Sequence, residues 1–282
     1  MKFQLKNIVA ALFMALTLTS CSDNDDSVAV NELDGLTKFQ EMTNTTHTIE
    51  LYSKAGTLVQ GYNEIKLRIK DNATNQYVKN ATVSWMPIMH MAMMNHSCPN
   101  SEVGKITTDG TLYEGYIVFQ MAQNDTEYWD LNVNYTIDGV DYTTASVIDV
   151  PASVKRTVNS FMGSDNVKYI VAYAEPNHPK VAVNDMIVGV WKMQDMMTFP
   201  VVDGYTLKID PRMPSMGNHS SPNNVHATQT TAGDLYNGKL SLTMTGYWKI
   251  NLQLAKPDGT IVKGEEITET VTASSIFFEI EF

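Results

Sequence analysis

The sequence predicts an all-β protein made of short antiparallel strands. Apolar and polar residues alternate with period two in segments such as Glu64–Lys70 and Tyr116–Met121, which is typical of strands with one face in a core and the other in water. No long segment after residue 40 has helical periodicity. Closely spaced turn signals separate the strands, with Asp-Gly at 109–110, 138–139 and 258–259 and Asn-Gly at 237–238. Strands and turns at this density predict small antiparallel β-sandwiches.

Two related copies of one module, each of about 110 residues, account for most of the chain. The matching segments are Ile49–Tyr52 with Ile170–Tyr173, Asn63 with Asn184, Thr111–Gly115 with Asp234–Gly238, Met121 with Met244, and Tyr128-Trp129 with Tyr247-Trp248. The step from the isoleucine to the asparagine is fourteen residues in both copies. We therefore expect one sandwich over 41–152, a connector with few strand signals over 153–168, and a second sandwich over 169–282. The tryptophans are expected in the cores, at Trp85, Trp129, Trp191 and Trp248.

The N-terminus predicts a lipoprotein signal peptide over residues 1–20. Lys2 and Lys6 precede an apolar run, Ile8–Thr17, that is too short to span a bilayer. The run ends in Leu-Thr-Ser before Cys21, which matches the lipobox of bacterial lipoproteins, so Cys21 is the expected lipidation site. Residues 21–40 are then a lipidated acidic tether. Its start, Ser-Asp-Asn-Asp-Asp, resembles the export tag of surface lipoproteins of the Bacteroides and Flavobacterium lineage, which implies the cell surface, with the periplasmic face of the outer membrane as the alternative.

Charge and cysteine content exclude some classes of function. Without Lys2 and Lys6, which belong to the signal, 18 of the 20 basic residues remain against 31 acidic ones, so binding to nucleic acid is not expected. With Cys21 lipidated, Cys98 has no partner for an internal disulfide. No serine–histidine–aspartate arrangement, paired-carboxylate motif, HExxH or phosphate loop occurs, so the protein is not expected to be an enzyme.

Each copy contains one segment rich in methionine and histidine. Both segments reduce to Met-Pro-x-Met, a spacer, and Asn-His-Ser-x-Pro-Asn, and the first spacer is four residues longer when the segments are aligned on Met-Pro. We call 86–100 the first Met–His segment and 213–223 the second. The candidate ligands are Met86, Met89, His90, Met91, Met93, Met94, His96 and Cys98 in the first segment, and Met213, Met216 and His219 in the second.

These side chains predict a copper site. Thioethers are neutral, soft donors that suit Cu(I), and imidazole binds either oxidation state of copper. In an extended segment Met89, Met91 and Met93 would point to one side. Cys98 corresponds to Ser221, so it is either an additional ligand of the first site or an incidental thiol, and His226 has no counterpart in the first copy. Core packing and a methionine-rich surface for docking a protein are the alternative interpretations of both segments.

The Met-Pro-x-Met pattern at Met86–Met89 and Met213–Met216, within small β-sandwiches of an extracytoplasmic lipoprotein, resembles the YtkA-like/FixH-like domain group. The resemblance covers most of 41–282. It implies immunoglobulin-like folds and an association with copper handling or oxidase assembly, although the chain lacks the transmembrane helix of a FixH-type protein.

The function expected is copper sequestration, delivery or tolerance at the cell envelope, with a copper donor or acceptor protein as the partner. The alternative is a non-metal surface accessory protein that binds a glycan or a protein, with Tyr113, Tyr116 and Tyr236 exposed. A third hypothesis is an assembly factor for a respiratory oxidase.

Overall fold

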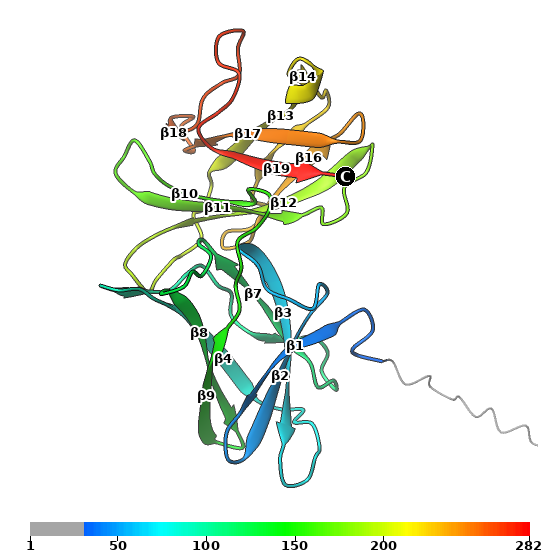
Figure 1. Ribbon diagram of the computed structural model, residues 1–282, viewed down its shortest axis with the longest axis vertical. Helices are drawn as coiled ribbons and strands as arrows, with labels where there is room; N and C mark the ends of the chain where they lie inside the picture. The colour runs from blue at the N-terminus through cyan, green and yellow to red at the C-terminus, as the bar shows by residue number, and fades with distance from the viewer. Residues whose placement is uncertain (1–30) are drawn as a thin grey trace, which may run out of the picture. The chain divides into compact units, whose positions relative to one another are not determined.

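The computed structural model describes residues 31–282, and every strand pairing among them is antiparallel (Figure 1). The only helix in this part of the chain is one turn of 3-10 helix, η1 (Pro214–Met216). The all-β, antiparallel prediction is therefore confirmed. The predicted signal peptide, Cys21 and the acidic stretch lie outside the described residues. Residues Glu32–Phe282 form one compact unit.

Two sheets enclose the core of the first half. One has the strand order β1-β2-β3-β7-β6 and the other the order β5-β4-β8-β9. The core draws on both sheets, with Ile49 and Leu67 from the first and Trp85 and Trp129 from the second. The strands are β1 (Thr37–Thr43), β2 (His47–Ser53), β3 (Gly61–Asp71), β4 (Thr82–His90), β5 (Asn95–His96), β6 (Gly104–Lys105), β7 (Tyr113–Phe119), β8 (Tyr128–Ile137) and β9 (Val140–Ile148).

The second half repeats this order, but its strands are joined into one sheet. The order is β10-β11-β12-β16-β15-β13-β17-β18, with β14 paired to β13 and β19 paired to β17. Because β15 pairs with both β16 and β13, it links two groups of strands that are separate sheets in the first half. The strands are β10 (Val158–Met162), β11 (Lys168–Glu175), β12 (Val183–Lys192), β13 (Thr206–Met213), β14 (His219–Ser220), β15 (Val225–Thr228), β16 (Tyr236–Ser241), β17 (Tyr247–Ala255), β18 (Ile261–Lys263) and β19 (Phe277–Glu281).

The register of the strands repeats along with their order. Asn63 faces Ile117 across β3 and β7, and Asn184 faces Leu240 across β12 and β16. Each asparagine side chain accepts a hydrogen bond from the backbone amide four residues before it and donates to the carbonyl of that same residue. The two copies found in the sequence thus correspond to two copies of one strand arrangement.

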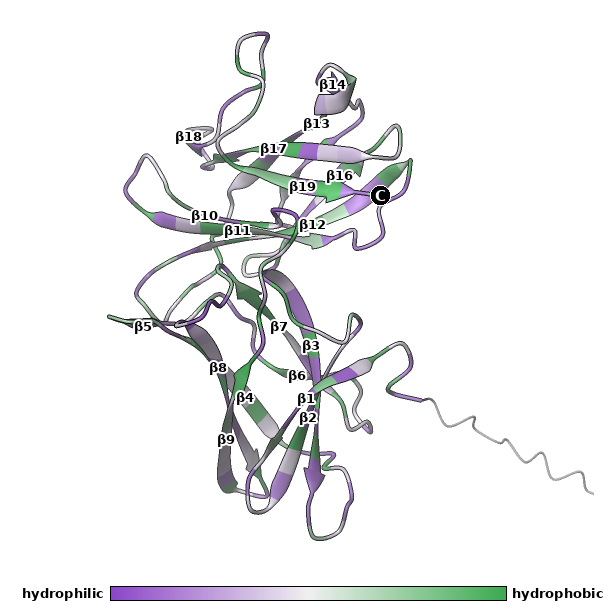
Figure 2. Ribbon diagram, in the orientation of Figure 1, coloured by the Kyte–Doolittle hydropathy of each residue, from purple (hydrophilic) through white to green (hydrophobic). Residues whose placement is uncertain are grey.

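The predicted tryptophan cores are confirmed, since all four side chains are buried. The indole of Trp129 donates a hydrogen bond to the carbonyl of Met121 at 3.1 Å, and that of Trp248 donates to the carbonyl of Met244 at 3.0 Å. Burying an indole is favourable when its N–H has a hydrogen-bond acceptor, and in each copy a methionine carbonyl is that acceptor. Figure 2 shows the mixed apolar and polar colouring along the strands that carry these cores.

The stretch expected to be a connector, 153–168, contains β10, which pairs along its whole length with β11. One local expectation was wrong. Asn237-Gly238 is not a turn but lies within β16, opposite Ile187 and Met186 of β12. A side chain at Gly238 would lie 2.7 Å from the carbonyl oxygen of Val225, so this glycine permits the close approach of β15. By contrast, Asp138-Gly139 forms the predicted two-residue turn between β8 and β9, with positive φ at both residues.

A third apolar cluster lies between the two copies. It contains Val118 of β7, Ile170 and Ala172 of β11, and Trp191 and Phe199 from β12 and the segment after it. Tyr62 and Tyr116 of the first half pack against it from one side, and the Tyr116 ring lies 6.0 Å from that of Trp191. This cluster holds the segment that follows β12 close to the first Met–His segment.

Candidate metal centre

The first Met–His segment forms a hairpin of β4 and β5, here called the first hairpin. The chain reverses over Met91–Met94, where the Met91 amide donates to the Met94 carbonyl at 3.1 Å. Met89 then faces His96, and His90 faces Asn95. Since side chains alternate across a strand, this register divides the candidate ligands between the two faces of the hairpin.

Met89, Met91 and His96 share the inner face. Met89 is fully buried, and Met91 is half-buried and packs against the same core. Residues directly opposite each other on neighbouring strands have Cβ atoms about 4.5–5.5 Å apart, so the Met89 thioether and the His96 imidazole are neighbours. Trp129 faces Met89 from the other side, and its ring meets the edge of the His96 ring at 5.7 Å.

Hydrogen bonds fix the tautomer of His96. Its Nδ1 lies 2.7 Å from the Ser97 carbonyl oxygen, and because a carbonyl oxygen only accepts, Nδ1 carries the proton. The Gln120 amide approaches the same nitrogen at 3.4 Å. In the neutral ring the lone pair is then on Nε2, and no described residue hydrogen-bonds to that atom. Histidines that bind metals commonly donate their second ring N–H to a backbone carbonyl or a carboxylate in this way.

Met86 and His90 lie on the outer face, away from Met89. His90 Nε2 lies 2.8 Å from a carboxylate oxygen of Asp130, and the ring stacks on Tyr128 at 4.8 Å. The Met86 thioether accepts a hydrogen bond from the Ser97 hydroxyl at 3.4 Å. The structure thus separates two predicted ligands from the group on the inner face.

The remaining candidates of the first segment lie apart from both faces. Met93 and Met94 occupy the tip of the hairpin, and the Met93 side chain is 94% exposed. Cys98 is buried in the core beyond β5, where burial raises the pKa of its thiol well above the ordinary value. Its neighbour Pro99 accepts a hydrogen bond from Val118, which anchors this part of the chain to β7.

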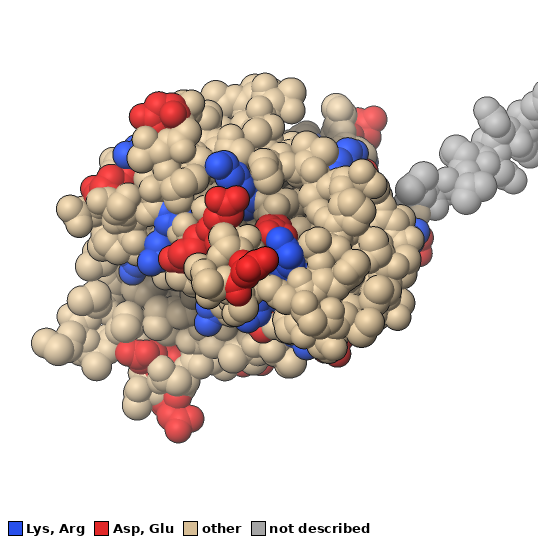
Figure 3. All heavy atoms as spheres, turned by 90° about the horizontal axis from the view of Figure 1, so that it is seen from above, with Lys and Arg blue, Asp and Glu red and all other residues tan. Residues whose placement is uncertain are grey.

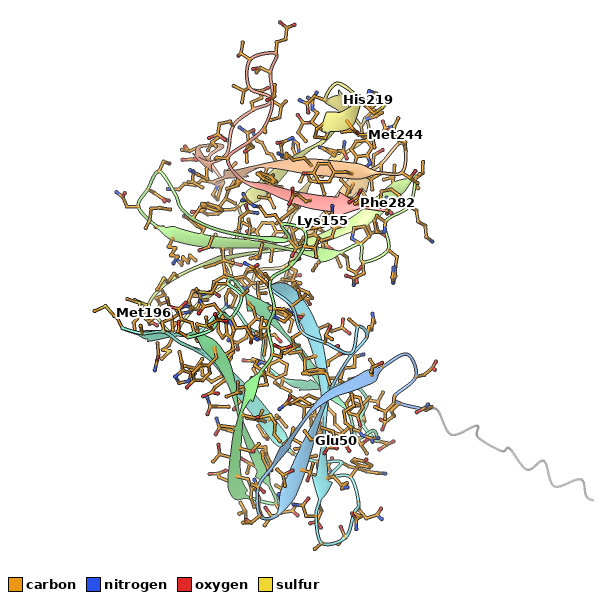
Figure 4. All side chains as sticks on the ribbon, viewed as in Figure 1. Glu50, Lys155, Met196, His219, Met244 and Phe282 are labelled. Carbon is orange, nitrogen blue, oxygen red and sulfur yellow. The ribbon has the colours of Figure 1, made fainter. Side chains whose placement is uncertain are left out.

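The second Met–His segment forms a hairpin of β13 and β14, here called the second hairpin. Met213 is buried and faces His219, which is exposed. Met216 lies on η1 with its side chain exposed (Figure 4 labels His219 and Met244 at this end of the second half). His226 lies on β15, where its Nδ1 accepts a hydrogen bond from Ile209, and burial together with Lys208 lowers its pKa.

The two Met-Pro-x-Met motifs do not occupy equivalent positions. Pro87 faces Leu131, two residues after Trp129, and Pro211 faces Ile250, two residues after Trp248. The residues that correspond are therefore Pro87 with Pro211 and Met89 with Met213, not Met86 with Met213. The turn from methionine to histidine then differs by one residue between the hairpins, and not by the four suggested by the sequence alignment. What both halves share is a methionine that faces a histidine across a hairpin, next to a buried tryptophan.

Sequence reasoning missed two methionines close to the first hairpin. Met196 and Met197 belong to a turn after β12, and the Ser97 amide donates to the Met196 carbonyl at 2.8 Å. The signal was visible as a third methionine-rich stretch, Met193-Gln-Asp-Met-Met197. It has no copy in the first half, so a search guided by the repeat passed over it.

Residues 31–282 contain no group of three or more His, Cys, Asp or Glu side chains placed to hold a metal ion. Thioether sulfur suits Cu(I) better than it suits zinc, calcium or magnesium. Acidic and basic side chains are interspersed on the face shown in Figure 3. No helix among the described residues is long and apolar enough to cross a membrane.

The tyrosines named for glycan binding do not form an exposed face. Tyr113 and Tyr236 are buried, and their hydroxyls donate to the carbonyls of Lys79 and Val202. The Tyr116 ring packs at a tilt against that of Tyr62, with centroids 5.1 Å apart. Stacking on a sugar needs an open aromatic face, which Tyr113 and Tyr236 do not provide.

Neither a scan against protein-family models nor a search of curated proteins finds a match to this chain. The geometry of the two hairpins is therefore the basis for the functional argument.

Proposed function

We propose that the protein is a non-enzymatic lipoprotein of the bacterial cell envelope that binds Cu(I) through its Met–His hairpins. Its role would be copper sequestration, delivery or tolerance, with a copper donor or acceptor protein as the partner. The observation that carries the proposal is the repeated pairing of a methionine with a histidine, Met89 with His96 and Met213 with His219. In both copies a methionine and a histidine thus occupy facing positions of a hairpin, at the same place in the strand order.

The first hairpin supplies the fuller ligand set. Met89 lies near the end of β4 and faces His96, and Met91, at the start of the turn, packs against the same core as Met89. Two thioethers and one imidazole make a neutral, soft set, which suits a monovalent ion. The second hairpin offers Met213 and His219 with an exposed Met216 nearby, so we expect weaker binding there.

Replacing both inner-face methionines with leucine tests the proposal. Leucine has nearly the volume of methionine but no sulfur, so Met89→Leu with Met91→Leu should leave the fold intact and remove two ligands. We expect the affinity for Cu(I), measured by competition with a chromogenic Cu(I) chelator, to fall at least about tenfold. Met42→Leu is the matched control because Met42 is buried in the same core on β1. Equal affinities for the double variant and the wild type would refute the assignment.

The envelope location rests on the sequence of the first 26 residues. We propose cleavage before Cys21, lipidation of its thiol and attachment to the outer membrane, with display on the cell surface. Intact-mass analysis of the protein from its native membrane should show the loss of residues 1–20 and the added mass of a diacylglyceryl group. A mature chain that retains residues 1–20, or that carries an unmodified Cys21, would contradict this.

We also propose that 41–152 and 169–282 are tandem immunoglobulin-like sandwiches of the YtkA-like type. The repeated order of β2-β3-β7 and β11-β12-β16, with matching registers, supports this assignment. A superposition of each half on the other and on immunoglobulin domains tests it.

A further inference from the structure

A turn from the second half is hydrogen-bonded to the first hairpin. This junction turn, Gln194–Thr198, is closed by the Gln194 amide, which donates to the Thr198 carbonyl at 3.0 Å. The Asp195 carboxylate accepts a hydrogen bond from the Met197 amide at 2.7 Å. These two hydrogen bonds define the backbone conformation of the turn, which carries two consecutive methionines. Figure 4 labels Met196 on it.

Ser97 connects the junction turn to the outer face of the first hairpin. Its amide donates to the Met196 carbonyl at 2.8 Å, and its hydroxyl donates to the Met86 thioether at 3.4 Å. One buried serine thus contacts both methionines. The side chains of Met86, Met196 and Met197 are nevertheless 38%, 42% and 43% exposed. Burial in a core does not explain three methionine side chains that remain open to solvent on two hydrogen-bonded segments.

The internal repeat provides a comparison for the turn. In the first half Val78 hydrogen-bonds to Ile69, and in the second half Val202 hydrogen-bonds to Val190. Between these paired residues the first half has eight residues and no methionine, whereas the second has eleven, among them Met193, Met196 and Met197. The longer connection of the second half therefore carries the methionines. Met193 packs against the apolar cluster between the halves, whereas Met196 and Met197 are exposed.

The same comparison applies to Met86. Its counterpart in the second half is Asp210, which lies on β13 and pairs with Arg212 at 2.7 Å. Methionine is therefore present at Met86 and in the junction turn. It is absent from Asp210, the counterpart of Met86, and from the connection after β3, the counterpart of the turn. This distribution indicates a role for sulfur at the junction itself.

We propose that Met86, Met196 and Met197 form a second Cu(I) site, built from both halves and separate from the site at Met89, Met91 and His96. Three thioethers supply soft ligands with no charge, a set that suits Cu(I) and binds hard cations poorly. The site lies on the outer face of the first hairpin, whereas the proposed first site is on the inner face, so the two can fill independently. An ion held here would also fasten the junction turn to the hairpin.

Titration of the full chain with Ag(I), a soft monovalent ion that does not change oxidation state, tests the site directly. With the methionine methyl groups labelled with carbon-13, we expect the resonances of Met86, Met196 and Met197 to shift along one binding curve. In Met196→Leu with Met197→Leu, the number of bound ions should fall by one and the Met86 methyl should stop responding. Met162→Leu is the control, since Met162 is an exposed methionine on β10.

Each outcome separates this inference from the proposed function. Unchanged stoichiometry in the junction variant, with the Met89 and Met91 methyls still shifting, overturns the second site and leaves the first. Loss of one ion from the junction variant while Met89 and Met91 never respond supports the second site alone. Absence of any Ag(I) binding by the wild type overturns both. A further expected result is slower hydrogen exchange of the Ser97 amide on loading, because the bound ion would hold its acceptor in place.

Discussion

Trp129→Ala is expected to lower the free energy of unfolding by about 3–5 kcal/mol and also to weaken Cu(I) binding at the first hairpin. Trp129 is fully buried, and its loss leaves a cavity that the surrounding strands cannot fill. The same side chain faces Met89 and contacts the edge of His96, so the cavity opens directly behind the proposed ligands.

Trp248→Ala is the matched control supplied by the repeat. Trp248 is equally buried and makes the equivalent hydrogen bond, so its loss should reduce stability by a similar amount. Its cavity would lie in the second half, and binding at Met89 and Met91 should stay as in the wild type. Denaturant unfolding and the methyl resonances of the labelled methionines give the two readouts. Equal weakening of the first site by both variants would show that the effect is a general loss of stability and not local support of the ligands.

The all-β, antiparallel character was predictable because strand burial leaves a direct trace in the sequence. Alternation over Glu64–Lys70 reproduces the alternation of buried and half-exposed residues on β3. The repeated strand arrangement was predictable because each copy keeps residues with the same structural role. Asn63 and Asn184, for example, make the same hydrogen bonds with the backbone. The turn prediction at Gly238 was wrong because glycine is favoured both in two-residue turns and where strands approach closely.

The arrangement of the ligands could not be obtained from the sequence alone. A shift of one residue in a hairpin moves every side chain to the other face, and the sequence does not fix that register. Met86 and Met89 therefore looked like partners in one motif but lie on opposite faces. Similarly, Met196 comes near the first hairpin only through a contact between segments a hundred residues apart, which no local pattern encodes.

Arg68→Met is expected to lower the free energy of unfolding by about 3 kcal/mol at pH 7, because it leaves a buried carboxylate with fewer partners. The Glu50 side chain is 7% exposed and lies 3.3 Å from the Arg68 guanidinium, which also stacks on Tyr77 at 3.6 Å. Lys66→Met is the control on the same strand, since Lys66 pairs only with the exposed carboxylates of Glu64 and Glu114. Such exposed pairs contribute about 1 kcal/mol or less.

The effect of Arg68→Met should shrink in acid, and the pKa of Glu50 gives the direction. Burial raises this pKa, but hydrogen bonds from Tyr52, Tyr77 and Arg68 and the positive charge of Lys38 outweigh burial and bring it below the ordinary value of 4.5. A carboxyl with a lowered pKa stabilises the fold above its unfolded pKa, and that stability is lost as the pH falls through the folded pKa. The wild type should therefore lose stability below about pH 4.5, whereas the variant, in which the Glu50 pKa is higher, should lose less. Urea unfolding at pH 7 and pH 4 measures the free energy of unfolding of both proteins. If the difference between wild type and variant is larger at pH 4, Arg68 acts through packing on Tyr77 and not through the charge of Glu50.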